Sequence, residues 1–76
     1  MAHNPNMYVG TLDAGQAAKL REILEDQGWE TDVIAYSRWR ARKDKTSATA
    51  YESGKFVVQG KGTGELVQFI VEPQIL

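Results

Sequence analysis

The sequence contains no cysteine and only one histidine, His3, among its 76 residues. The lack of cysteine excludes a disulfide framework and a thiolate metal site, and a lone histidine excludes a histidine-based zinc site or catalytic triad. No apolar run approaches the roughly 20 residues of a membrane helix, and the first residues lack the segments of a signal peptide. We therefore expect a cytoplasmic protein that makes no membrane contact.

The chain is also short. Its 76 residues, of which 42% are hydrophobic, are enough for one small domain. A folded chain of this length buries only about 60% of the surface that its unfolded form exposes, which leaves little room for a large enzyme pocket. The polar residues 1–6 predict a disordered opening stretch, and residues 7–76 then form the single domain.

Charge is unevenly distributed along the chain, although the formal net charge is only -1. The segment from Arg38 to Lys61 holds seven cations and two anions, a net of +5, whereas the rest of the chain carries -6. Such segregation is typical of a nucleic-acid-binding domain with one basic surface on an acidic body. The alternative is a solvated sheet whose cations maintain solubility and protect its edges.

Side-chain periodicity predicts four strands and two helices. A β-prone run over 7–12 precedes apolar residues at helical spacing over 14–27, where Asp13 is the N-cap and Gln16 completes a capping box. Strands are predicted over 34–42, 47–51 and 55–59, and a second helix is capped by Thr63 and ended by Pro73. The order β-α-β-β-β-α indicates a two-layer α+β fold, an antiparallel sheet with both helices on one face.

The length of the last turn decides which side chains share a face of the sheet. A two-residue turn at 53–54 would mix polar and apolar residues on both faces. A three-residue turn over 52–54, with Gly54 in the left-handed conformation, puts Tyr51 opposite Lys55 and separates the faces cleanly. Pairing Arg42 with Ser47 extends the same division, with Trp39 on the apolar face.

The polar face that results predicts a nucleic-acid-binding surface, with cations for phosphates and with amide and hydroxyl groups for sugars or base edges. Strand alternation also places Tyr36 on this face. Tyr51 is the better candidate for stacking on a base or packing against a sugar. No residues are predicted to be catalytic or to bind a metal. The candidate binding residues are Arg38, Arg40, Arg42, Thr49, Tyr51, Lys55, Val57, Gln59 and Lys61.

Several of these residues lie in segments that carry a family resemblance. They are YESGKFVVQGKGT at 51–63, ELVQF at 65–69, Glu72-Pro73, KLREIL at 19–24 and WRAR at 39–42. Together they resemble the N-terminal domain of bacterial ribonuclease HIII. The hairpin at 53–55 resembles, more distantly, the half-saddle repeat of the TATA-binding protein.

The resemblance implies a TATA-binding-protein-like half-saddle that helps a parent enzyme grip RNA/DNA hybrid duplexes. A separate C-terminal ribonuclease H domain would hold magnesium or manganese and cleave the RNA strand. The present chain is then expected to bind without cutting, as a monomer and without a cofactor. In the saddle family the positions that match Tyr51, Lys55, Val57 and Gln59 face the nucleic acid. With one repeat and no wedge pair of aromatics, sharp kinking of DNA is not expected.

Two further interpretations compete with this one. The basic sheet could instead dock acidic helices of another copy or of an enzyme body, as a protein-interaction or assembly module. The glycine-punctuated residues 60–64 resemble a phosphate-binding loop in outline but lack the Walker and dinucleotide spacings, and a strand-to-helix turn explains the glycines.

Overall fold

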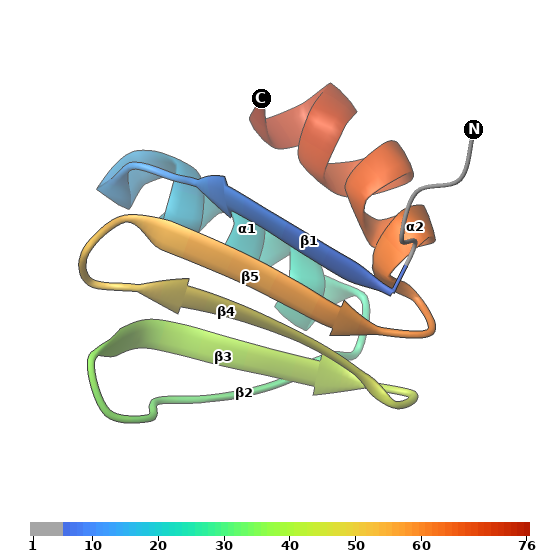
Figure 1. The fold of residues 1–76 in the computed structure, drawn as a ribbon, viewed down its shortest axis with the longest axis horizontal. Helices are drawn as coiled ribbons and strands as arrows, with labels where there is room; N and C mark the ends of the chain where they lie inside the picture. The colour runs from blue at the N-terminus through green and yellow to red at the C-terminus, as the bar shows by residue number, and fades with distance from the viewer. Residues whose placement is uncertain (1–5) are drawn as a thin grey trace.

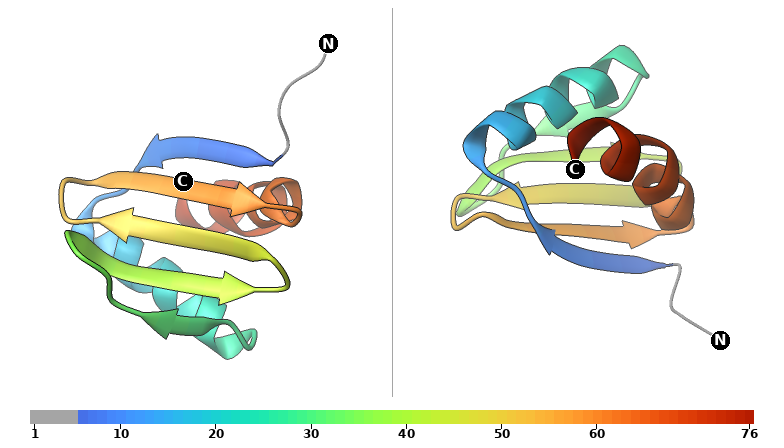
Figure 2. Two further views of the ribbon diagram at one scale, coloured as in Figure 1. Left: turned by 60° about the horizontal axis from the view of Figure 1, so that its bottom comes forward. Right: turned by 90° about the horizontal axis from the view of Figure 1, so that it is seen from above.

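The computed structural model describes residues 6–76, which form a single antiparallel sheet with all helices packed on one face (Figures 1 and 2). The strand order is β1-β5-β4-β3-β2, so the first strand lies at one edge beside the last one. The elements are β1 (Met7–Thr11), α1 (Ala14–Asp26), β2 (Glu30–Asp32), β3 (Ser37–Lys43), β4 (Thr46–Tyr51), β5 (Lys55–Gly60), α2 (Thr63–Leu66) and η1 (Val67–Ile75). The predicted α+β fold is confirmed.

The predicted order lacked one strand. The short strand β2 pairs antiparallel with β3 and forms the second edge of the sheet, with Asp32 opposite Arg40. Correspondingly, β3 begins at Ser37 and not at residue 34, because Tyr36 has a left-handed backbone with a φ of 64°. The predicted opening stretch lies outside the described residues except for Asn6, whose carbonyl oxygen accepts a hydrogen bond from the Gly60 backbone N–H at 3.0 Å.

Helix α1 begins and packs as its sequence predicts. The Asp13 carboxylate accepts a hydrogen bond from the Gln16 N–H at 2.7 Å, and the Gln16 amide oxygen accepts one from the Asp13 N–H at 3.0 Å. This capping box satisfies two of the N–H groups that a helix start leaves free. Leu20 and Leu24 are buried against the sheet, and the Trp39 indole N–H donates to the Ala17 carbonyl oxygen at 3.0 Å.

The second helix continues through Pro73, contrary to the prediction that this proline ends it. After α2 the chain widens into the π-helical segment η1, in which the Leu76 N–H donates to the Val71 carbonyl oxygen at 2.9 Å. The side-chain amide of Gln74 donates to the Phe69 carbonyl oxygen at 3.3 Å, the oxygen that an N–H at position 73 would reach in an α-helix and that proline cannot bond. The wider turn also buries Val71 and leaves Phe69 62% exposed.

The core lies between the helices and the inner face of the sheet. Phe56 is fully buried at the centre of the core. The centroid of its ring lies 6.2 Å from that of Tyr8 and 6.3 Å from that of Trp39. Trp29 packs partly buried against the same cluster. The small inner residues Ala41 and Ala48 leave room for the helices to approach the sheet. All large inner side chains therefore point toward the helices, which leaves the other face free.

Both hairpin turns fix this division. The turn between β4 and β5 has three residues, with Gly54 at a φ of 100° and Ala50 opposite Phe56, as predicted. The preceding turn is tighter than the predicted one over 43–46, because Lys43 already pairs with Thr46. Its two residues, Asp44 and Lys45, have φ values of 50° and 64°, as the primed turns of two-residue hairpins require.

The backbone at Gly60 gives a prediction for stability. Its φ is 116°, and an added Cβ would overlap the Lys45 carbonyl oxygen and lie 2.7 Å from the Thr46 Cα. We expect Gly60→Ala to lower the free energy of unfolding by more than about 2 kcal/mol, measured by thermal and urea denaturation. Gly15→Ala in α1 is the control, since its Cβ would have ordinary space at 3.4 Å from Asp13 and should slightly stabilise the helix. Equal stability of the two variants would contradict this account.

Candidate nucleic-acid interface

The sheet face opposite the helices is covered by no other element among residues 6–76 (Figure 2). We call it the open face. The strand registers align its side chains in two rows that run across all the strands, from β1 to β2. One row is Met7, Gln59, Ser47, Arg42 and Glu30, and the other is Val9, Val57, Thr49, Arg40 and Asp32. The face therefore changes from apolar at β1, through neutral polar, to charged at β3 and β2.

The open face is hollowed along β5. A cavity of about 570 Å³ extends from the β4–β5 turn, where Tyr36 also lies, to Gln59 and Met7 at the other end of β5. Tyr36, Tyr51, Lys55, Val57, Gln59 and Met7 line it. We call this cavity the tyrosine hollow. It brings together four residues that the sequence predicts for binding, namely Tyr51, Lys55, Val57 and Gln59.

The arginines of the open face are partly neutralised by the edge strand β2. Arg40 forms a two-point ion pair with Asp32, with its Nε 3.0 Å from Oδ1 and its Nη2 2.7 Å from Oδ2. Arg42 approaches the same carboxylate at 3.6 Å. The hydrogen bond from Arg40 lowers the pKa of Asp32, and in return the carboxylate raises the pKa of Arg40. With Glu30 opposite Arg42 and Lys55 on β5, the strands place three cations and two anions on the face, so it is only weakly basic.

Three other predicted residues differ from the expected arrangement. Thr49 lies on the open face but is only 7% exposed between its neighbours Arg40 and Val57. Arg38 occupies the register shift between Ser37 and Trp39 and lines a shallow groove beside α1. Its predicted place on the polar face relied on uninterrupted alternation along the strand, which this bulge breaks. Lys61 lies past the end of β5, in the turn to α2.

The two edge strands, β1 and β2, place residues on the open face that the sequence analysis did not predict there. Met7 and Val9, 48% and 52% exposed, lie on the open face because β1 pairs with β5. The alternation of Met7, Val9 and Thr11 with Tyr8 and Gly10 was a signal for this face, but the neighbour of the strand could not be derived from it. Asp32 gave no signal, since three residues are too few to show a strand period.

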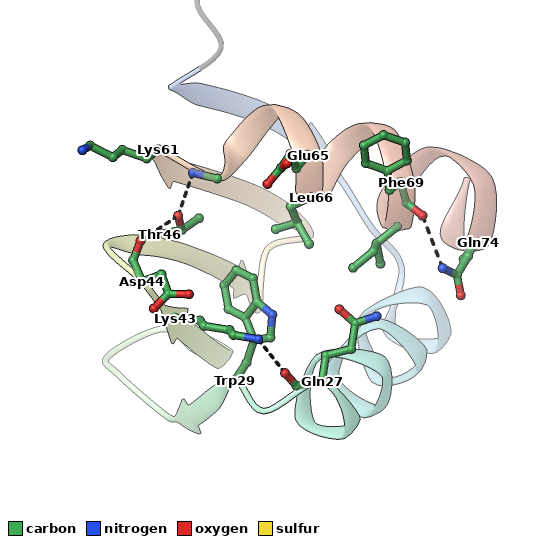
Figure 3. A pocket seen from close by; sticks show the side chains of 12 residues that line it. Gln27, Trp29, Lys43, Asp44, Thr46, Lys61, Glu65, Leu66, Phe69 and Gln74 are labelled. Carbon is green, nitrogen blue, oxygen red and sulfur yellow. Dashed lines mark hydrogen bonds between the residues drawn. The ribbon is translucent and has the colours of Figure 1, made fainter.

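A second cavity, of about 560 Å³, lies on the helix side between the end of α1, the β3–β4 turn and α2 with η1 (Figure 3). The Lys43 ammonium donates to the Gln27 carbonyl oxygen at 2.8 Å across its wall. The Lys61 side chain points away from it. At its rim the Gly62 N–H donates to Thr46 Oγ1 at 2.8 Å, and the Thr63 hydroxyl donates to the Gly60 carbonyl oxygen at 2.8 Å. These bonds support a structural role for the glycine-rich turn.

The described part of the chain, residues 6–76, holds no group of three or more histidine, aspartate or glutamate side chains that could bind a metal ion. Over the same residues, no helix has the length and apolar character to cross a membrane.

Residues 7–75 match the family described as Domain of unknown function (DUF3378). Ribonuclease HIII of Chlamydia trachomatis is 42% identical over 72 residues, which cover 95% of this chain and 24% of that protein. Ribonuclease HIII of Protochlamydia amoebophila is 44% identical over 69 residues, 91% of this chain and 23% of that protein. The chain thus spans about a quarter of the length of these curated relatives, in their N-terminal region.

Two solved structures share the fold. The crystal structure of Aquifex aeolicus RNase H3 aligns with a TM-score of 0.73 over 80% of this chain and 24% of that one, at 18% identity. The crystal structure of Bst-RNase HIII in complex with Mn2+ aligns with a TM-score of 0.65 over 87% of this chain and 21% of that one, at 28% identity. In each, the likeness covers a region and not the whole enzyme.

Proposed function

The chain belongs to the DUF3378 family and corresponds to the N-terminal region of ribonuclease HIII, and on this premise we propose that it binds RNA/DNA hybrid duplexes through the open face. The observation that carries the proposal is the composition of that face. Cationic, hydroxyl, amide and aromatic side chains lie on adjacent strands, with no element above them among the described residues. A duplex surface presents phosphates and sugars, which are the partners of these groups.

Each part of the open face has a role in this contact. Lys55 and Arg42, both exposed, meet phosphates, while Arg40 is held in place by Asp32 and presents its remaining N–H groups. Ser47 and Gln59 lie beside Arg42 in one row and can reach sugar hydroxyls, including the 2′-hydroxyl that only the RNA strand carries. Because these groups recognise backbone and shape, binding has little sequence preference.

Cleavage belongs to another part of a ribonuclease HIII. The Asp32 carboxylate of the open face is engaged with Arg40 and Arg42, and the residues described here form no group that fits a divalent metal site. In the longer enzyme a C-terminal catalytic domain would hold magnesium or manganese and cut the RNA strand. This chain, a monomer, increases the time that the hybrid spends near that domain.

The alternative, an assembly module, is favoured by one observation. The edge strand β1 exposes Met7 and Val9, and exposed apolar residues on an edge strand are typical of strand-to-strand association. Against it, Arg40 and Arg42 share the Asp32 carboxylate and Glu30 adds a second anion, so the face attracts an acidic helix only weakly.

Removing one cation and one amide from the open face tests the proposal. We expect Lys55→Ala/Gln59→Ala to weaken hybrid binding about tenfold, because a charge-assisted hydrogen bond contributes roughly 1.5 kcal/mol. Fluorescence anisotropy with one sequence prepared as hybrid, DNA duplex and RNA duplex, at two salt concentrations, measures the loss. Lys19→Ala/Gln68→Ala, which makes the same change at exposed helix positions, is the control and should bind normally.

No binding to any duplex at low salt would contradict the proposal. A molecular mass that rises with protein concentration in size exclusion would then favour the assembly alternative.

Removing the carboxylate that restrains the arginines has the opposite effect. We expect Asp32→Asn to strengthen hybrid binding several-fold and to steepen its salt dependence by up to about one unit in the log–log slope, because Arg40 and Arg42 become available to phosphates. The matched control is Glu25→Gln, which removes the partner of Arg21 on α1. If Asp32→Asn changes binding no more than Glu25→Gln does, the arginines lie outside the contact.

A further inference from the structure

Tyr36 has a backbone conformation that does not suit its side chain. Its φ is 64°, in the left-handed region, which glycine and asparagine adopt far more readily than an aromatic residue. Neighbouring hydrogen bonds hold it there: its carbonyl oxygen accepts from the Glu52 N–H at 2.9 Å, and the Ser37 N–H donates to the Ile34 carbonyl at 3.0 Å. The strain is therefore imposed by the surrounding structure.

Burial does not compensate this strain, because Tyr36 is 83% exposed. A glycine or asparagine would satisfy the same backbone, and little apolar contact would be lost. Folding alone thus gives no reason for an aromatic ring at this position. Strained residues with exposed side chains are typical of binding sites, where the side chain contacts a ligand.

The tyrosine hollow indicates which ligand this is. Tyr36 and Tyr51 both line it, without a ring-to-ring contact between them, and Met7 and Val57 supply apolar surface. Gln59 and Ser53 add an amide and a hydroxyl. The hollow therefore suits a flat ring with hydrogen-bonding groups at its edge.

The charges around the hollow argue against an anion or a cation as its occupant. Lys55 and Glu52 line it with opposite charges. A phosphate would be repelled by the carboxylate, and an ammonium group by the lysine. A neutral aromatic ring, linked to a phosphate that can reach Lys55 from the rim, fits both.

Resting on the proposed function, we propose that the tyrosine hollow binds one unpaired nucleobase from a single strand that continues the bound duplex. Bases inside a duplex are stacked on their neighbours and cannot enter, whereas an unpaired base can stack on a tyrosine ring regardless of its identity. The hollow runs along β5 on the open face, and Gln59 belongs both to it and to the row that contains Ser47 and Arg42. A strand leaving the duplex on that face reaches the hollow directly.

The test compares one hybrid duplex in three forms: blunt, with a short single-stranded extension, and with an extension of abasic sugar-phosphate. Extensions of both polarities are used. We expect the extension with bases to tighten binding of the wild-type chain about fivefold or more, as stacking of one base implies. The abasic extension carries the same charge and should bind like the blunt duplex.

Two variants assign the effect to Tyr36. Tyr36→Asn, which suits the backbone and should not lower thermal stability, is expected to lose the preference for the extension while binding the blunt duplex like wild type. Tyr36→Phe keeps the ring and should keep the preference.

Equal binding of the blunt and extended forms would overturn this inference alone, and so would a preference that survives in Tyr36→Asn. Failure to bind even the blunt hybrid would instead overturn the proposed function.

Discussion

The open face depends on where two turns fall in the chain. Because side chains alternate between the two faces of a strand, a slip of one residue at either turn would move Phe56 or Trp39 out of the core and bring Lys55 or Arg40 into it. Left-handed residues fix both turns: Gly54 in the loop before β5, and Asp44 with Lys45 before β4. Helices α1 and η1 cover the apolar face that results, and the opposite face keeps the polar residues in ordered rows.

The open face is less basic than the net charge of the segment from Arg38 to Lys61 suggests. The positive segment includes Lys43, which donates to the end of α1, and Arg38, which the bulge directs to a groove beside the same helix. Strand β2 then adds Asp32 beside Arg40. Under the proposed function, a face with few free cations would bind a duplex through shape and hydrogen bonds as well as through charge. Such a contact is suited to an accessory domain that shares its substrate with a catalytic partner.

Local patterns predicted most of the fold and about half of the candidate site. The capping box at Asp13 and the turn at Gly54 each act within a few residues, so α1 and the face of Tyr51 could be derived from the sequence. Strand β2 could not, because three residues show no period and their pairing is a tertiary contact. Likewise, no local rule signals that η1 passes through Pro73 or that a bulge displaces Arg38. The partner of β1, and with it the hollow, also depended on long-range pairing.

The central claim is that nucleic acid lies on the open face and not on the helix side. The most direct test is a titration of the isotope-labelled chain with a blunt RNA/DNA hybrid, followed by backbone amide chemical shifts. The account predicts shifts that are concentrated in β3, β4 and β5, with Ser47, Lys55 and Gln59 among the largest. Shifts concentrated instead in α1, η1 and the cavity of Figure 3 would contradict it.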